Sequence, residues 1–278
     1  MNIGKTNRLR VVKTVDFGVY LDGDGDEILL PTRYVPEGGL LPDAEVDVFI
    51  YRDSEDRLIA TTERPLAEVD QCAYLEVKEV TRVGAFCDWG LMKDLLVPFR
   101  EQQRPMVAGG YYAVYVYLDE RTGRPAGSTR LQRFIENEEL TVAEDDAVDL
   151  LILDQTDLGY RTVINDRHWG LLYHNDVFEP LQTGDHRRGF VRKIREENKV
   201  DVSLRRGGYD EVPHAVLRVM QALRAGGGHL PLHDRSAPAE IYDALGISKK
   251  MFKKAVGLLY RERRIQLEEG GIRLVPED

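Results

Sequence analysis

The sequence is poor in the residues that build cross-linked or membrane-spanning proteins. Only two cysteines occur in 278 residues, Cys72 and Cys87, and their spacing fits no metal-ligand pattern. We interpret both as packing residues, since free cysteine is among the most buried residue types. No apolar run approaches the roughly 18 residues of a membrane span, and the N-terminus has no secretory-signal pattern. We therefore expect a cytoplasmic protein without a membrane partner.

Positive charge is also scarce in this chain. Its 38 lysines and arginines face 48 aspartates and glutamates, which gives a formal net charge of −10. Nucleic-acid-binding domains usually present a basic face and a high isoelectric point, so the total argues against a simple nucleic-acid binder. The distribution changes this interpretation, because residues 209–278 hold 11 basic and 10 acidic residues while the preceding residues carry the excess acid.

Patterns that carry catalysis or ion binding are missing as well. The sequence has no phosphate-binding Walker loop, no serine nucleophile elbow and no reactive cysteine context. His229 and His233 lack a third ligand at suitable spacing. Asp22, Asp24 and Asp26 alternate as in a calcium loop, but no bidentate glutamate follows. We therefore expect no enzyme, no metal site and no cofactor.

The chain instead repeats itself weakly, three times. The repeated landmarks, at offsets of 66 to 67 and 75 residues, are Gly18, Gly84 and Gly159; Leu29-Leu30-Pro31, Leu96-Val97-Pro98 and Leu171-Leu172-Tyr173; and Thr61, Ser128 and Ser203. This period is too long for a common solenoid repeat, so each unit is predicted to be a small domain.

Each unit is predicted to contain five short strands with one long central loop. In the first unit the strands are Arg8–Val15, Gly18–Leu21, Glu27–Leu30, Val46–Tyr51 and Arg57–Thr61. The turn residues Asp22 to Gly25 tolerate positive φ and predict a hairpin between the second and third strands. This pattern is typical of the oligonucleotide-binding (OB) barrel. We predict three such barrels, at residues 1–64, 65–140 and 141–208.

Residues 209–278 change character and are predicted to be helical. A first helix capped by Asp210 ends at Gly226, and a second runs from about Ser236 to Leu245. Ser248 caps a third helix, and a Glu-Glu-Gly-Gly turn then separates two short strands. Three helices and a β-hairpin predict a winged helix-turn-helix. The predicted fold class is therefore mainly β: three tandem five-stranded OB barrels followed by an α+β winged helix.

One face of the predicted third helix is basic. On a helical wheel, a stripe about 100° wide contains Lys250, Lys253, Lys254, Gly257, Arg261 and Arg264, with Lys249 just outside it. Residues 248–264 hold seven basic side chains and one acid, whereas an ordinary solvated helix face mixes both signs. Phosphate contact and plain solvation are the two interpretations.

A second basic cluster covers the last two predicted strands of the third unit. Its members are Arg187, Arg188, Arg192, Lys193, Arg195, Lys199, Arg205 and Arg206. Arginine binds phosphate with two hydrogen bonds and stacks on bases, so nucleic-acid contact is one interpretation. Pairing with the acid-rich surfaces of neighbouring barrels is the other.

The first unit resembles the S-one domain, an RNA-binding OB barrel. That family carries aromatic–Gly–small–aromatic on its second strand, which Phe17-Gly18-Val19-Tyr20 matches, and an arginine before its fifth strand, which Arg57 matches. In the second unit Phe86 and Arg124 match. In the third unit Arg161 follows a sequence that has lost the aromatic pattern, and Lys199 replaces the arginine.

The family's third-strand histidine is replaced in every unit. Pro31 and Pro98 occupy its position in the first two units, and Tyr173 in the third. Proline cannot donate a hydrogen bond to phosphate, so the first two barrels are either RNA-binding or spacers. Phe17 and Tyr20 are accordingly either exposed for stacking or packed in a core or interface.

The order of three such barrels and a winged helix resembles the conserved virulence factor B family of bacterial RNA-binding proteins. The stretches that carry this resemblance are WGLMKDLLVPFREQ (Trp89–Gln102), WGLLYHNDVF (Trp169–Phe178) and GISKKMFKKAVGLLYRERRI (Gly246–Ile265). The resemblance covers essentially the whole chain. It implies RNA binding with a regulatory role, and no catalysis.

We predict a protein that binds single-stranded RNA with low sequence specificity and regulates expression after transcription. The residues predicted to contact nucleic acid are Phe17, Tyr20, Arg57, Phe86, Arg124, Arg161, Tyr173, Arg188, Arg192, Lys193, Lys199, Arg205, Lys249, Lys250, Lys253, Lys254, Arg261 and Arg264. Two alternatives remain open. One is a winged-helix transcriptional regulator that binds DNA, and the other is a protein-interaction scaffold on the ribosome or polymerase.

Overall fold

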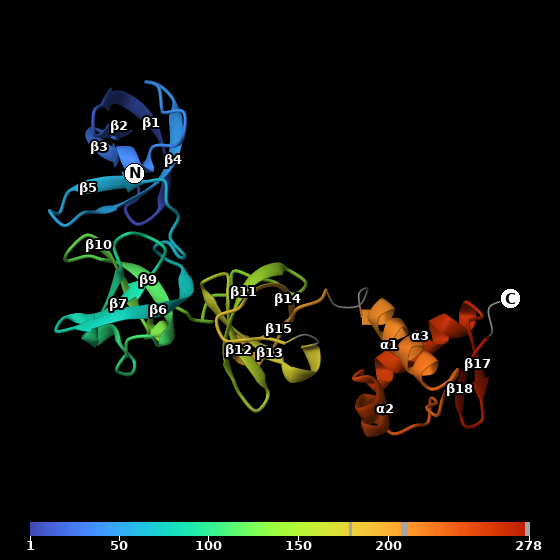
Figure 1. Cartoon of the computed structure of the whole chain (residues 1–278). Helices are drawn as coiled ribbons and strands as arrows, with labels where there is room; N and C mark the ends of the chain where they lie inside the picture. Colours follow the sequence, from blue (N-terminus) through green and yellow to red (C-terminus); the bar gives the residue numbers. More distant parts are fainter. Residues whose placement is uncertain (178–179, 207–210, 276–278) are drawn as a thin grey trace. The chain divides into compact units, whose positions relative to one another are not determined.

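A computed structural model describes residues 1–177, 180–206 and 211–275 of the chain (Figure 1). The predicted helix cap Asp210 lies outside these described residues. The chain divides into two compact units, the first comprising Met1–Asn137, Val163–Trp169 and Gln182–Asp185, and the second comprising Glu138–Thr162, Gly170–Leu181 and His186–Asp278. The element groups below follow the order of the predicted domains.

The first group of strands closes into a barrel, as predicted for the first unit. Its strands are β1 (Thr6–Val15), β2 (Gly18–Gly23), β3 (Asp26–Pro31), β4 (Glu45–Arg52) and β5 (Leu58–Thr61). They pair in the order β1-β2-β3-β5-β4, with β3 and β5 parallel and the other pairs antiparallel. Leu21, Ile28, Leu30 and Ile50 are fully buried inside it, as alternating strand residues should be.

The second group has the same strand order but is open along one edge. Its strands are β6 (Cys72–Thr81), β7 (Gly84–Asp88), β8 (Leu95–Pro98), β9 (Tyr111–Asp119) and β10 (Arg124–Ser128). They form a sheet of order β10-β9-β6-β7-β8, in which no hydrogen-bonded ladder joins the described residues of β8 and β10. Pro125 has no backbone N–H, which removes one donor from this edge. The middle sheet therefore repeats the strand order of the predicted barrel, with β8 and β10 in contact, but without the ladder that closes it.

The third group again forms a closed barrel. Its strands are β11 (Ala147–Gln155), β12 (Gly159–Ile164), β13 (His168–Tyr173), β14 (His186–Ile194) and β15 (Val200–Ser203). Their order, β11-β12-β13-β15-β14, repeats that of the first barrel, including the parallel pair β13–β15. The described residues thus contain two closed five-stranded barrels and one open five-stranded sheet.

The repeated glycines have one structural cause. A Cβ atom at Gly18 would lie 2.1 Å from the carbonyl oxygen of Leu30, and one at Gly84 would lie 2.3 Å from that of Val97. Gly159 repeats this contact at 2.1 Å on its own neighbouring strand. Gly18 and Gly84 also have a φ of +152°, which side-chain-bearing residues rarely adopt. Only glycine lets the second strand of each group lie this close to the third.

The repeated hydroxyls also have a shared role. Each is buried at the end of the fifth strand of its group. The hydroxyl oxygen of Thr61 accepts a hydrogen bond of 3.0 Å from the backbone N–H two residues later, and Ser128 and Ser203 accept the same bond at 3.1 and 3.2 Å. A side-chain acceptor here satisfies a backbone donor that the strand no longer pairs.

The first barrel and the middle sheet share a hydrophobic core within the first compact unit. Phe49 of β4 packs edge-to-face on Trp89, with ring centroids 5.6 Å apart. Tyr51 and Leu95 belong to the same cluster, and Cys87 lies fully buried in it. Both cysteines are free and buried, which confirms their interpretation as packing residues.

The C-terminal residues form the predicted three helices and hairpin. The elements are α1 (Glu211–Ala225), β16 (His229–Leu230), α2 (Pro238–Leu245), α3 (Lys249–Arg261), β17 (Ile265–Glu268) and β18 (Gly271–Leu274). The hydroxyl of Ser248 accepts a hydrogen bond from the N–H of Met251, and Gly246 ends α2 with a φ of +64°. The short strand β16 pairs with β18 and was not predicted. Within the described residues, no helix has the length and apolarity needed to cross a bilayer.

Candidate nucleic-acid interface

The aromatic pair of the first barrel lies on its surface. Phe17 is 57% exposed, and its ring centroid lies 6.3 Å from that of Tyr20 in an edge-to-face arrangement. The ammonium of Lys13 lies 4.8 Å from the centre of the Tyr20 ring. The pair therefore combines an exposed ring, Phe17, with a half-buried ring, Tyr20, beside a cation, and the core-packing interpretation of Phe17 does not hold.

The predicted phosphate ligand of this barrel, Arg57, is held by carboxylates. Its guanidinium donates to Asp53 at 2.8 and 2.9 Å and also lies 2.9 Å from Glu55. These partners raise the pKa of Arg57 above its ordinary value, first through the hydrogen bonds that Arg57 donates to Asp53. A phosphate at this position would have to compete with two carboxylates.

A cleft of about 820 Å³ opens on the middle sheet. Its lining brings together the predicted residues Phe86 and Arg124. Further residues for which the sequence predicted no binding role also line it: Arg52, Val83, Met92, Lys93, Leu96, Phe99, Arg100 and Arg121. We call this hollow the middle-sheet cleft. It combines exposed apolar side chains with guanidinium groups, the two kinds of surface that single-stranded nucleic acids use.

The middle-sheet cleft is locally basic in an acidic chain. Its lining holds five basic residues (Arg52, Lys93, Arg100, Arg121 and Arg124) and three acidic ones (Glu79, Asp94 and Asp119), an excess of two positive charges. The whole chain, by contrast, has a formal charge of −10. Burial, and then the nearby guanidinium of Arg124, lower the pKa of Lys93 below its ordinary value. The lining therefore favours an anion over a neutral ligand.

Arg124 also joins the two parts of the first compact unit. Its guanidinium donates to the backbone oxygen of Asp53 at 2.8 Å and to the carboxylate of Asp56 at 3.0 Å. Both acceptors belong to the β4–β5 turn of the first barrel. The arginine predicted to bind phosphate thus also has a structural partner.

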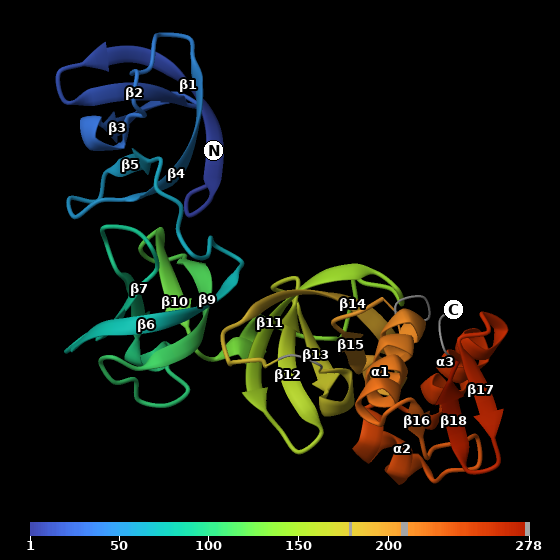
Figure 2. The ribbon, with the colours of Figure 1, turned by 45° about the vertical axis from the view of Figure 1, so that its right-hand side comes forward.

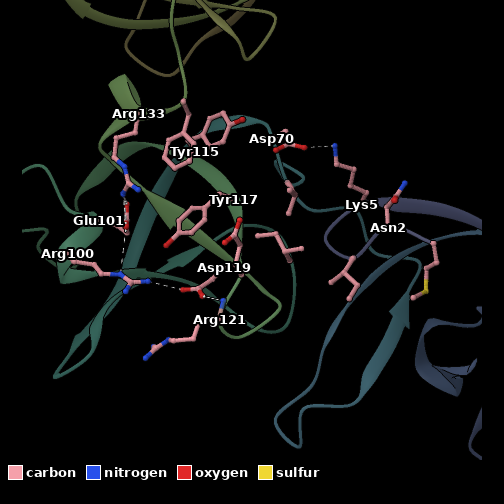
Figure 3. Close-up of a pocket in the computed structure, with 16 residues that line it drawn as sticks. Asn2, Lys5, Asp70, Arg100, Glu101, Tyr115, Tyr117, Asp119, Arg121 and Arg133 are labelled. Carbon is pink, nitrogen blue, oxygen red and sulfur yellow. Dashed lines mark hydrogen bonds and ion pairs between the residues drawn. The ribbon is translucent and has the colours of Figure 1, made fainter.

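A second, larger hollow of about 1310 Å³ lies along β9 (Figure 3). Tyr115 and Tyr117 of β9 stack on Phe134, with centroid distances of 4.4 and 5.5 Å. Figure 3 shows an ionic chain beside them, listed in order as Arg133, Glu101, Arg100 and Asp119. The three stacked rings and this ionic chain are thus engaged with one another, and Arg100 and Asp119 of the chain also line the middle-sheet cleft.

Part of the basic cluster of the third barrel is neutralised within that barrel. The ion pairs are Arg161–Asp154 at 2.6 Å, Arg188–Asp149 at 3.2 Å, Arg195–Asp201 at 2.9 Å, Lys199–Glu197 at 2.6 Å, and Arg192–Asp176. Lys193 is exposed, whereas Arg205 and Tyr173 are half-buried. Four of the eight cluster members therefore have carboxylate partners, as does Arg161 outside the cluster. The partners lie in the same barrel, not in its neighbours.

The basic stripe of α3 is different. Figure 2 shows α3 next to the β17–β18 hairpin. Lys250, Lys253, Lys254 and Arg261 are exposed, and none of them has an ion-pair partner within the described residues. Lys249 instead donates to the backbone oxygen of Ser236 at 2.8 Å and is half-buried, so its ammonium serves the fold. Arg264 lies 3.3 Å from Glu262. Four adjacent cations remain on one helix face.

The hairpin next to α3 carries the opposite charge. Glu268 and Glu269 lie at the β17–β18 turn, and both are exposed. Arg273 binds Glu268 at 2.5 Å, and these hydrogen bonds lower the pKa of that carboxyl. Since Arg273 neutralises Glu268, the exposed Glu269 is the charge at the tip of this wing that would repel a phosphate backbone, whereas α3 would attract one.

Comparison with known proteins agrees with this architecture. The S1 domain model matches residues 3–63, and the CvfB-like winged helix domain model matches residues 217–274. The fold therefore defines a mainly β protein that combines an S1 domain with a winged helix, two families of nucleic-acid-binding domain.

Relatives match across most of the chain. A Bacillus subtilis protein, the uncharacterized protein YitL, is 27% identical over 97% of this chain and 93% of its own length. Conserved virulence factor B of Staphylococcus aureus is 25% identical over 83% of this chain and 79% of its own. This chain is a relative of the conserved virulence factor B proteins, which confirms the resemblance noted in the sequence.

A solved structure also aligns along the chain. It is a multidomain protein with nucleic acid binding domains from Streptococcus pneumoniae, with 21% identity, 98% coverage of both chains and a TM-score of 0.41.

Proposed function

We propose that this protein binds single-stranded RNA with low sequence specificity and acts as a regulator of gene expression, without catalysing a reaction. The observation that carries the proposal is the basic face of α3, where four exposed cations have no carboxylate partner within the described residues. In a chain of net charge −10, four such cations on one helix favour a polyanionic ligand.

The proposed mechanism combines electrostatic capture with stacking. Cations of α3 hold the phosphate backbone, and aromatic side chains accept bases. These are the exposed Phe17 with the half-buried Tyr20 on the first barrel, and the exposed Phe99 with the half-buried Phe86 in the middle-sheet cleft. Each stacked base contributes about 1–3 kcal/mol and discriminates little between sequences. Because ion pairs hold Arg161, Arg188, Arg192, Arg195 and Lys199 in the third barrel, we assign that barrel a smaller share of the binding energy.

The charge of the wing favours a single strand over duplex DNA. Winged helices that read DNA commonly place the hairpin against the backbone, and here its turn carries Glu268 and Glu269. Like charges at that contact oppose a duplex, whereas a single strand can follow α3 alone. We infer the regulatory role from the relatives named conserved virulence factor B, because that name refers to virulence.

Fluorescence anisotropy with a labelled oligouridylate tests the proposal, with single-stranded and duplex DNA of matched length as competitors. We expect RNA binding to weaken steeply between about 50 and 200 mM salt, with a slope of about −0.7 per phosphate contact. Stronger competition by duplex DNA would favour the transcriptional regulator instead. Undetectable binding at low salt would favour the protein scaffold, and cleavage of the oligonucleotide with magnesium present would indicate an enzyme.

A further inference from the structure

Gly257 lies inside α3, and no contact or backbone conformation of the fold requires glycine there. Glycine is the poorest helix former apart from proline, so an interior glycine weakens a helix relative to alanine. Its backbone is helical, with no positive φ, and a Cβ built on it would have no heavy atom within 4 Å. Neither backbone conformation nor crowding therefore requires glycine at this position.

The position of Gly257 on the helix is the centre of the basic stripe. Residues three and four positions apart are neighbours on a helix surface. Lys253 and Lys254 therefore flank Gly257 on one side along the helix, and Arg261 flanks it on the other. All three cations are exposed. The missing side chain leaves bare backbone among them.

Arg263, just after the end of the same helix, is the opposite case: a side-chain-bearing residue at a position that favours glycine. Its φ is +57°, a left-handed conformation that usually follows a helix as glycine. The surrounding hydrogen bonds are those of a regular helix end, from the N–H of Arg263 to Tyr260 and from the N–H of Arg264 to Leu259. Its side chain is exposed. The helix thus has a cation where its fold favours glycine, and glycine where its fold favours a side chain.

An exposed aromatic side chain completes the surface. Tyr260 is 55% exposed, and its ring stacks on no other aromatic ring among the described residues. It lies three positions after Gly257 and therefore borders the same patch of helix.

We infer that Gly257 forms a contact notch, at which the backbone of a single-stranded RNA lies directly against α3. Tyr260 stacks a base beside it, and Arg263 contacts the next phosphate. The absence of a Cβ lets sugar and phosphate come closer to the helix than any other residue would allow. This inference deepens the proposed function and rests on it.

The decisive variants are Gly257→Ala and Arg263→Gly, because both favour the helix and remove the proposed contacts. We expect Gly257→Ala to raise the thermal unfolding midpoint of the winged helix, and to weaken oligouridylate binding at least threefold. We expect Arg263→Gly to leave that midpoint unchanged or higher, and to reduce the magnitude of the salt slope by about 0.7, the value for one phosphate contact. Tyr260→Ala should weaken binding about fivefold or more, as expected for one lost base stack.

The control is Gln221→Ala, an exposed position on α1. It favours a helix in the same way and should leave RNA affinity unchanged. A reference variant changes three residues to Glu: Lys250, Lys253 and Lys254. It distinguishes a failure of the contact notch from a failure of the proposed RNA binding. If it weakens binding and Gly257→Ala does not, the notch is wrong and the proposed function stands. If neither weakens binding, α3 is not the RNA surface.

Discussion

At the residue scale, Gly18 determines how closely two strands of the first barrel approach. We expect Gly18→Ala to lower the free energy of unfolding by about 1–3 kcal/mol, because the new Cβ meets the Leu30 carbonyl and the φ of +152° becomes strained. Urea denaturation of the full chain measures this. Gly25→Ala is the control, since Gly25 also has a positive φ, of +113°, but open space around it. Equal losses in both variants would show that strand contact plays no part.

The sequence predicted the position of this glycine, but it did not predict several residues that line the middle-sheet cleft. The glycine repeat was visible because its cause, close backbone approach, acts at one position in each unit. Phe99 and Arg100 were missed as binding residues because they follow Pro98, outside the strand. Their place in the same cleft lining as Phe86 depends on how β7 and β8 pair. A pattern within one strand can be predicted from the chain, whereas a cleft assembled from several strands and turns cannot.

At the scale of elements, the β4–β5 turn is stabilised by an ionised carboxylate. Burial tends to raise the pKa of Asp53, but hydrogen bonds from the Arg57 side chain and from two backbone N–H groups outweigh it and hold the pKa below its ordinary value. Such a group stabilises the fold above its unfolded pKa of about 3.9, and that stability is lost as the pH falls through the lower, folded value.

We therefore expect Asp53→Asn to destabilise the first barrel at pH 7 and to have less effect at pH 3. Urea midpoints of wild type and variant at the two pH values measure this. Asp47→Asn, on the exposed face of β4, is the control for the loss of one negative charge. A difference between wild type and Asp53→Asn that is the same at both pH values would contradict the ionic explanation.

The third barrel shows what sequence could not predict at this scale. The basic residues of β14 were evident, but their partners are remote along the chain. Arg188 meets Asp149 because β11 and β14 pair in a register that places these two residues opposite each other. Neutralisation therefore depends on barrel closure, whereas the α3 stripe was predictable because helical periodicity alone decides it.

At the scale of the whole molecule, the first barrel and the middle sheet share one core. We expect Phe49→Ala to cost about 3–5 kcal/mol and to lower hydrogen-exchange protection in both β4 and β6, because Phe49 packs in the cluster that contains Trp89 and Leu75. Ile28→Ala, in the separate cluster of the first barrel, should affect that barrel alone. Protection lost only in β4 would show that the shared core does not couple the two parts.

The domain order was predictable from repeats and helical patterns, but the shared core of the first barrel and the middle sheet was not. Four consecutive apolar residues of β4, Val48 to Tyr51, indicate burial on both faces of the strand, but nothing local identifies the middle sheet as the partner of Phe49. The ionic link from Arg124 to Asp56 spans 68 positions and likewise has no sequence signal.

The place of Trp89 gives the molecule an internal optical reporter. The chain has only two tryptophans, and Trp89 is buried against Phe49 while also lining the middle-sheet cleft. With Trp169 replaced by phenylalanine, the remaining indole emission comes from the seam between barrel and cleft. Quenching by an added oligonucleotide would then report occupancy there without any attached dye, and a red shift in denaturant would report the seam opening.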